Sequence, residues 1–252
     1  MTRLPTLRIA LLLATVSGTA SAQIFHLREP SVRDQWTFGM SGFGGFPVGE
    51  FHQNEDGGAG GDLTVGFQPF RREPLVLRGS AGLLMYGYYD RNVDRDVCDA
   101  FGNCTTETVY YNSRYHTMSF FQIGPELMAT DGKYRPFAFA MVGRTLFNSW
   151  ADVGDPYTTD VNHGLFFSNN FSTAYGGGLR IVKQGFGREQ GLELGVRFTR
   201  NAKARYVTDR GVYQRSDGSW DVSPISGAAN VLGIHVGYWM GPYINWNERR
   251  SR

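Results

Sequence analysis

The chain beyond its first 22 residues lacks any long hydrophobic run. No stretch there approaches the about 18 uninterrupted apolar residues that a membrane-spanning helix needs. Charged residues make up only 19% of the chain, below the about 25% of ordinary soluble domains. The formal net charge is +2, so the chain has no electrostatic footprint for nucleic acid. These shortages exclude a helical membrane protein and a nucleic-acid partner.

The N-terminus carries the pattern of an export signal. Arg3 and Arg8 precede an apolar run from Ile9 to Val16, and small residues end at Ala20-Ser21-Ala22. This order is typical of a secretory signal peptide, here residues 1–22, cleaved near Ala22. An uncleaved membrane anchor is the alternative, but its apolar run falls short of the roughly 20 residues that span a bilayer. We therefore expect the mature protein to work outside the cytoplasm.

Cysteine is scarce as well. The two cysteines, Cys98 and Cys104, lie close together in a polar segment. In an oxidising compartment such a pair favours a disulfide that closes a small loop. Half of a metal site is the alternative, but no Cys or His stands nearby to complete it. We predict the disulfide, and no metal or cofactor.

What the chain has in abundance is alternation of apolar with small or polar residues. In residues 191–199 every even position is a large apolar side chain, and every odd one is glycine, charged or hydroxyl. Successive side chains of a strand point to opposite faces, so this segment has one oily and one polar face. The pattern recurs in eight segments, approximately 35–48, 59–67, 75–89, 116–128, 136–147, 171–182, 191–199 and 230–243.

The connectors are sorted by length. Those at 68–74, 130–135 and 183–190 are short, whereas those at 90–114, 148–170 and 200–224 are long and polar. Tight turns at one end and long loops at the other are typical of an outer-membrane barrel. Because a sheet in hydrocarbon must pair all its backbone groups, it has to close. We predict an all-β fold, an eight-stranded antiparallel up-and-down transmembrane barrel over 34–243, with a short N-terminal segment at 23–33 and a polar tail at 244–252.

The alternation assigns the two faces. The predicted lumen carries a nearly balanced charge network that fills it and leaves no open pore, consisting of Asp62, Arg78, Glu126, Arg144, Arg180, Glu193, Arg197 and His235. We expect these groups to form one connected network. The side chains predicted to face lipid are Leu63, Val65, Leu77, Leu83, Ile123, Phe139, Leu179, Leu192, Leu194, Val196, Leu232, Ile234 and Val236.

With these features the chain resembles the small eight-stranded outer-membrane barrels of the OmpA/OmpX type. The last segment is similar to the C-terminal assembly signal of that group, with Gly237-Tyr238-Trp239 and Tyr243, although a polar tail follows where the signal usually ends on an aromatic residue. The resemblance implies short periplasmic turns, long extracellular loops and passage through the outer-membrane assembly machinery.

Two patterns could carry chemistry. His116 and Ser119 resemble the His and Ser of a lipid A deacylase, but residues three apart on a strand face opposite sides, so no catalytic residue is assigned. Residues 90–96 alternate oxygen ligands as a calcium loop does, yet lack the glycine and the final acidic residue of that motif. We interpret the segment as a solvated acidic loop.

We therefore expect a non-enzymatic protein of the bacterial outer membrane. Its partners would be the lipid bilayer, the assembly machinery, and an extracellular ligand or surface reached by the long loops. Its function would be display: adhesion, surface contact or envelope stability. The alternatives are a lipid A or phospholipid hydrolase with its site at the rim, and a secreted soluble barrel that binds a small apolar ligand.

Overall fold

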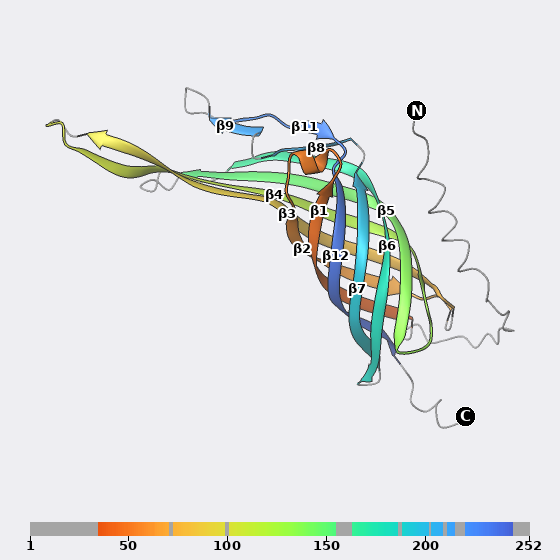
Figure 1. Ribbon diagram of the computed structural model, residues 1–252. Helices are drawn as coiled ribbons and strands as arrows, with labels where there is room; N and C mark the ends of the chain where they lie inside the picture. The colour runs from red at the N-terminus through yellow and green to blue at the C-terminus, as the bar shows by residue number, and fades with distance from the viewer. Residues whose placement is uncertain are drawn as a thin grey trace, which may run out of the picture. The chain divides into compact units, whose positions relative to one another are not determined.

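The computed structural model describes residues 35–70, 73–98, 101–154, 163–185, 188–201, 203–208, 211–214 and 220–243. The signal peptide, the N-terminal segment and the polar tail predicted from the sequence lie outside these residues. Almost every described residue belongs to a strand (Figure 1). Among the described residues, no helix is long and apolar enough to cross a membrane.

Eight strands form the main sheet. They are β1 (Trp36–Val48), β2 (Gly58–Phe67), β3 (Leu75–Cys98), β4 (Cys104–Met128), β5 (Tyr134–Gly154), β6 (His163–Gly185), β7 (Arg188–Asn201) and β12 (Asn230–Tyr243). Each pairs antiparallel with its neighbours, and β1 pairs with both β2 and β12, which closes the barrel in the order β1-β12-β7-β6-β5-β4-β3-β2. The predicted fold class of an eight-stranded antiparallel barrel is confirmed.

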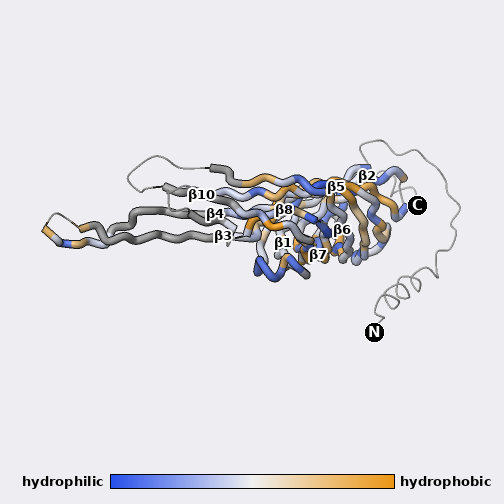
Figure 2. Tube along the Cα trace, turned by 90° about the horizontal axis from the view of Figure 1, so that it is seen from above, coloured by the Kyte–Doolittle hydropathy of each residue, from blue (hydrophilic) through white to orange (hydrophobic). Residues whose placement is uncertain are grey.

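The barrel wall alternates as the sequence predicts for β7. Glu193 and Arg197 are buried inside, while Leu192, Leu194 and Val196 are exposed outside. Along the barrel strands hydrophobic residues recur between hydrophilic ones in the hydropathy colouring (Figure 2). The exposed large hydrophobic residues come from all eight strands of the wall. The sheet therefore presents an apolar surface on its outside, while its inside holds both charged and hydrophobic side chains.

Four strands are much longer than the apolar alternation suggests. The predicted 90–114 loop is wrong, because β3 and β4 stay paired as far as Cys98 and Cys104 and project beyond the barrel (Figure 1). The pairing of β5 with β6 likewise continues to Ala151 and His163. In these extensions the hydrophobic period is lost while the backbone ladder continues.

The predicted disulfide is present at the tip of the β3–β4 hairpin, where Cys98 bonds Cys104. Gly102 in the intervening turn has a φ of 81°, a left-handed conformation that glycine adopts without strain. The tip is thus covalently closed at the point where the strands reverse.

A small cap covers the barrel at its long-hairpin end. The short helix η3 (Phe51–Gln53) and the strand β8 (Ala204–Tyr206), which pairs with β11 (Ile225–Gly227), bring Phe51 and Tyr206 together with ring centroids 4.9 Å apart. Both side chains are buried. Burial raises the pKa of the Tyr206 phenol above its ordinary value of 10.0. A further pair, β9 (Val212–Gln214) and β10 (Trp220–Val222), lies in the same connection between β7 and β12.

Candidate functional site

The part of the lumen nearer the short-turn end holds a ring of two arginines and two glutamates. Arg78 Nη1 lies 2.6 Å from Glu126 Oε2, and its Nη2 lies 3.2 Å from Glu193 Oε1. Arg180 closes the ring from the other side, with Nη1 2.6 Å from Glu126 Oε1 and Nε 2.7 Å from Glu193 Oε2. The ring is neutral as a unit, and each carboxylate accepts from both guanidiniums, which offsets the cost of burying four charges.

Aromatic rings from β5 and β12 surround this ring of charges. The Arg78 guanidinium lies 4.9 Å from the centroid of Phe139, and that of Arg180 lies 4.4 Å from Phe137 and 5.0 Å from Trp239. These are distances at which cations interact favourably with ring faces. The aromatic side chains therefore fill the lumen and also stabilise the charges within it.

A second polar layer lies further along the lumen, around Asp62 and Arg197. Arg197 Nη1 is 3.3 Å from Asp62 Oδ2, and its Nη2 donates to Gln122. Ser80 donates to Asp62 Oδ2 at 3.2 Å, and Ser41 donates to Oδ1.

His235 completes this layer. Its Nδ1 lies 3.3 Å from the Ser41 hydroxyl and 3.9 Å from Asp62, and its ring stacks on Phe43 with centroids 4.6 Å apart. The arrangement is a buried polar layer capped by aromatic rings.

Seven of the eight residues predicted for the lumen network lie on the inner face: Asp62, Arg78, Glu126, Arg180, Glu193, Arg197 and His235. Among the described residues their ion pairs form two neutral groups, whereas the sequence predicted one connected network. The cavity left between them is about 10 Å³, the space of about one water molecule.

The prediction for Arg144 is wrong. This side chain is exposed, and it stands opposite Phe121 and Phe171, which are exposed on the outer face of β4 and β6. Arg144 is therefore an outer-face residue of β5 and takes no part in the lumen network.

The prediction that Phe139 faces lipid is wrong for the same strand. Phe137, Phe139 and Met141 are all buried inside, while Ala138, Ala140 and Val142 face outward. Phe137 and Phe139 stand opposite Gly178 and Gly176 of β6. A Cβ at Gly176 would come within 2.9 Å of the Phe139 ring. The glycines of β6 thus leave the room that the β5 rings occupy, and β5 faces the opposite way from the prediction.

The other twelve residues predicted to face lipid all lie on the outer side of the wall: Leu63, Val65, Leu77, Leu83, Ile123, Leu179, Leu192, Leu194, Val196, Leu232, Ile234 and Val236. Each is exposed except Leu179, which is half-buried.

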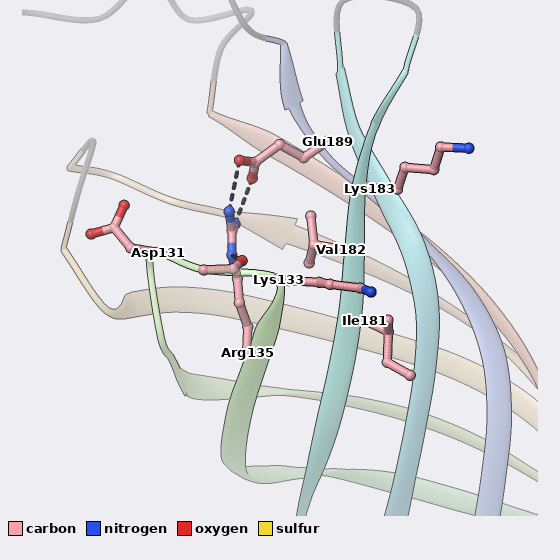
Figure 3. Close-up of a pocket in the computed structure, with 8 residues that line it drawn as sticks. Asp131, Lys133, Arg135, Ile181, Val182, Lys183 and Glu189 are labelled. Atoms are coloured by element: carbon pink, nitrogen blue, oxygen red, sulfur yellow. Dashed lines mark hydrogen bonds and ion pairs between the residues drawn. The ribbon is translucent and has the colours of Figure 1, made fainter.

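A cavity of about 720 Å³ opens at the short-turn end between β5, β6 and β7 (Figure 3). Arg135 and Glu189 form a two-pronged ion pair in its wall, with Nη–Oε distances of 2.5 and 2.7 Å. Lys133 and Lys183 also line it. This ion pair was not predicted from the sequence, because Arg135 and Glu189 both fall in segments predicted as turns.

His116 and Ser119 are not brought together. His116 is fully buried, and its Nδ1 lies 2.9 Å from Ser149 Oγ on β5. Ser119 stands opposite Leu83, on the outer face of the wall. The two residues therefore lie on opposite faces of β4, as the alternation of side chains along a strand predicted.

The segment 90–96 is a strand rather than an acidic loop, since it pairs with β4 throughout. The backbone of a calcium loop wraps around its ion, whereas this segment is an extended, paired strand. No cluster of His, Cys, Asp and Glu suited to a metal occurs within the part of the chain that the structure describes.

No protein-family model matches the chain, and no curated protein matches it. Several solved structures are similar to it at low identity. The chain is similar to Neisserial surface protein A (NspA), at 10% identity and a TM-score of 0.41 over 81% of this chain and 95% of that one. It is similar to a major outer membrane protein from Thermus thermophilus, at 13% identity and a TM-score of 0.41 over 81% and 98% of the two chains. It is also similar to Ail, the attachment invasion locus protein of Yersinia pestis, at 9% identity and a TM-score of 0.40 over 82% and 98%.

Proposed function

We propose that this protein is an integral barrel of the bacterial outer membrane that displays its long hairpins outside the cell. The single observation that carries the proposal is the closed sheet with an apolar outer face. Leaving one large apolar side chain in water rather than burying it costs about 1.5–3 kcal/mol. Leu63, Ile234 and Val236 are each at least half exposed, and exposed large hydrophobic residues occur on every strand of the wall. Lipid is the medium in which this surface is stable.

The filled lumen supports a scaffold rather than a pore. The two neutral charge groups, the surrounding rings and the cap occupy the interior, and about 10 Å³ remains between the charges. The space between the charges is too small for a drug-sized apolar ligand, which needs about 300 Å³ or more. The cavity of about 720 Å³ at the short-turn end is large enough, but charged side chains make up most of its lining. The soluble ligand-binding alternative is thereby disfavoured.

The long hairpins are the part of the molecule suited to display. β3 and β4 continue as a paired ribbon far beyond the start of β2, where Ala59 stands opposite Met85, and a disulfide closes the tip. A closed, fully paired barrel is a rigid base for such a ribbon. We propose adhesion, surface contact or envelope stability as its function, with an extracellular ligand or surface as the partner.

We further propose that the protein is not an enzyme. The His and Ser that suggested a lipid hydrolase lie on different faces of β4, and His116 is buried against Ser149. Incubation of the purified protein with lipid A and phospholipid checks this: wild type and the variants His116→Ala and Ser119→Ala should all leave the lipids intact. Hydrolysis lost in either variant would restore the enzyme hypothesis.

Fractionation tests the membrane proposal itself. The mature protein, freed of its signal peptide and inserted by the assembly machinery, should sediment with outer membranes and resist alkaline carbonate extraction. Folding of the purified protein into phosphatidylcholine vesicles, followed by proteolysis, should leave a protected fragment the size of the barrel. Quantitative release as a soluble protein would contradict the proposal.

A further inference from the structure

On β5, β6 and β7 an apolar band on the outer face is interrupted by a polar residue on all three strands. Moving away from the short-turn end, four outward positions are apolar, aromatic or glycine, beginning at Pro136 on β5, Ile181 on β6 and Leu192 on β7. The next outward position is Arg144 on β5, Thr173 on β6 and Arg200 on β7. One outward position further on, Leu146 on β5 and Phe171 on β6 are apolar again. Polar side chains therefore mark the long-hairpin rim of the band, and two of the three are arginines.

The two arginines flank a single strand. Arg144 stands opposite Phe171 of β6, and Arg200 stands opposite Thr173, two residues away on the same strand. Two strand spacings and a shift of two residues place their Cα atoms about 12 Å apart. Both side chains are exposed, and the exposed ring of Phe171 belongs to the strand between them. Two long guanidinium side chains at this separation can converge on one group above β6.

Neither arginine has an ionic partner among the described residues. Arg78, Arg180 and Arg197 in the lumen all have carboxylate partners within 3.3 Å. Arg144 and Arg200 form no ion pair with any residue that the structure describes, yet they stand at the edge of an apolar surface. A guanidinium at the edge of hydrocarbon is stabilised by an anion at headgroup level.

Among the side chains that the structure describes, the rest of the barrel circumference lacks such cations. On the outer face of β1–β4 and β12, no described side chain is Lys or Arg. The first polar residue beyond the apolar positions of the outer face is Ser119 on β4 and Asn230 on β12. The positive charge at this rim is therefore concentrated on the β5–β7 wall and is not a general feature of the boundary.

We propose that Arg144 and Arg200 form a binding site for the phosphate of a lipid headgroup. The lipid chains would lie along the apolar band that runs from Phe171 and Tyr175 toward the short-turn end. The planar fork of arginine matches a phosphate bidentately, and two forks on either side of one strand can hold one phosphomonoester. The proposal rests on the membrane placement proposed above. It assigns the ligand as a membrane lipid rather than free phosphate.

Native mass spectrometry of the full-length mature protein in alkyl maltoside micelles, which contain no phosphate, tests the site. The probe is lipid A, titrated with its phosphates and after their removal. Wild type should retain the phosphorylated lipid more tightly, and inorganic phosphate should not displace it. Arg144→Gln/Arg200→Gln should weaken retention about tenfold, which corresponds to about 1.4 kcal/mol. Arg144→Lys/Arg200→Lys should lie between the two.

The matched control is Lys133→Gln/Lys183→Gln, which removes the same charge at the short-turn end and should change retention by less than about twofold. Equal loss in the two double variants would assign the effect to net charge and overturn the site, as would unchanged retention in the arginine variant or displacement by inorganic phosphate. Insertion into phosphatidylcholine vesicles is measured in parallel. A protein that inserts but shows no phosphate preference loses only this site, whereas one that fails to insert loses the proposed function and the site with it.

Discussion

Arginine occurs on both faces of the barrel wall, and its surroundings differ completely. On the inner face Arg78 and Arg180 are almost fully buried, share two carboxylates and lie against aromatic rings. On the outer face Arg144 and Arg200 are exposed and have no described carboxylate partner. Inside the closed barrel Arg78 and Arg180 are neutralised by carboxylates of the protein itself. At the outer rim the surrounding medium can do so. The effect of a substitution should therefore depend on the face and not on the residue type.

The largest expected effect follows from breaking the inner charge ring. Arg180→Ala leaves Glu126 and Glu193 with Arg78 as their only ring partner inside the barrel. Leaving a buried carboxylate uncompensated costs about 3–5 kcal/mol, so the free energy of unfolding should fall by about that amount. Urea titration of the protein folded in vesicles measures it. The control Arg144→Ala should change stability by about 0.5 kcal/mol or less; equal losses would contradict the difference between the faces.

The second prediction tests the orientation of β5. Phe139→Ala should lower the free energy of unfolding by about 3–5 kcal/mol, because it removes a ring that fills the lumen beside Arg78. The neighbouring Ala140 is exposed on the other face, and Ala140→Phe should change stability by about 0.5 kcal/mol or less. If Ala140→Phe lowered the free energy of unfolding more than Phe139→Ala in the same urea titration, β5 would have the orientation predicted from the sequence.

The third prediction concerns the outer face alone. Leu194→Arg and Ile234→Arg should each destabilise the protein in vesicles by about 2–4 kcal/mol, as expected for a cation near the bilayer midplane. Leu146 lies on β5 one outward position beyond Arg144, so Leu146→Arg should cost about 1 kcal/mol or less. If all three variants unfold at the wild-type urea concentration, lipid does not contact this face.

Most of the wall could be predicted from the sequence because seven strands alternate clearly, and the Cys98–Cys104 disulfide followed from spacing and compartment. The orientation of β5 could not be predicted, because Phe137 and Phe139 are apolar and their hydrophobicity suits either face. These two rings lie inside because the glycines opposite them on β6 leave room for them there. The sequence of β5 alone does not show how much room the neighbouring strand leaves. The hairpin extensions were missed for a related reason. Their residues do not alternate between apolar and polar, so the backbone ladder leaves no period of two in the sequence.

The smallest effect is expected at the hairpin tip. Cys98→Ser/Cys104→Ser removes a disulfide that closes only the turn between β3 and β4. Unfolding of the barrel should change by about 0.5 kcal/mol or less, while hydrogen exchange of the hairpin amides should accelerate. Wild-type exchange rates in the variant would mean that the ribbon is held by contacts other than the disulfide.

One face of each barrel strand should contact lipid, and the other should contact a closed interior. Nitroxide labels placed singly at residues 191–199, in the Cys98→Ser/Cys104→Ser background in phosphatidylcholine vesicles, test it most directly. Collision with oxygen, which concentrates in lipid, should be high at residues 192, 194, 196 and 198. It should be low at the odd positions, and a water-soluble relaxation agent should reach neither set. High accessibility of the even positions to the water-soluble agent would contradict the account.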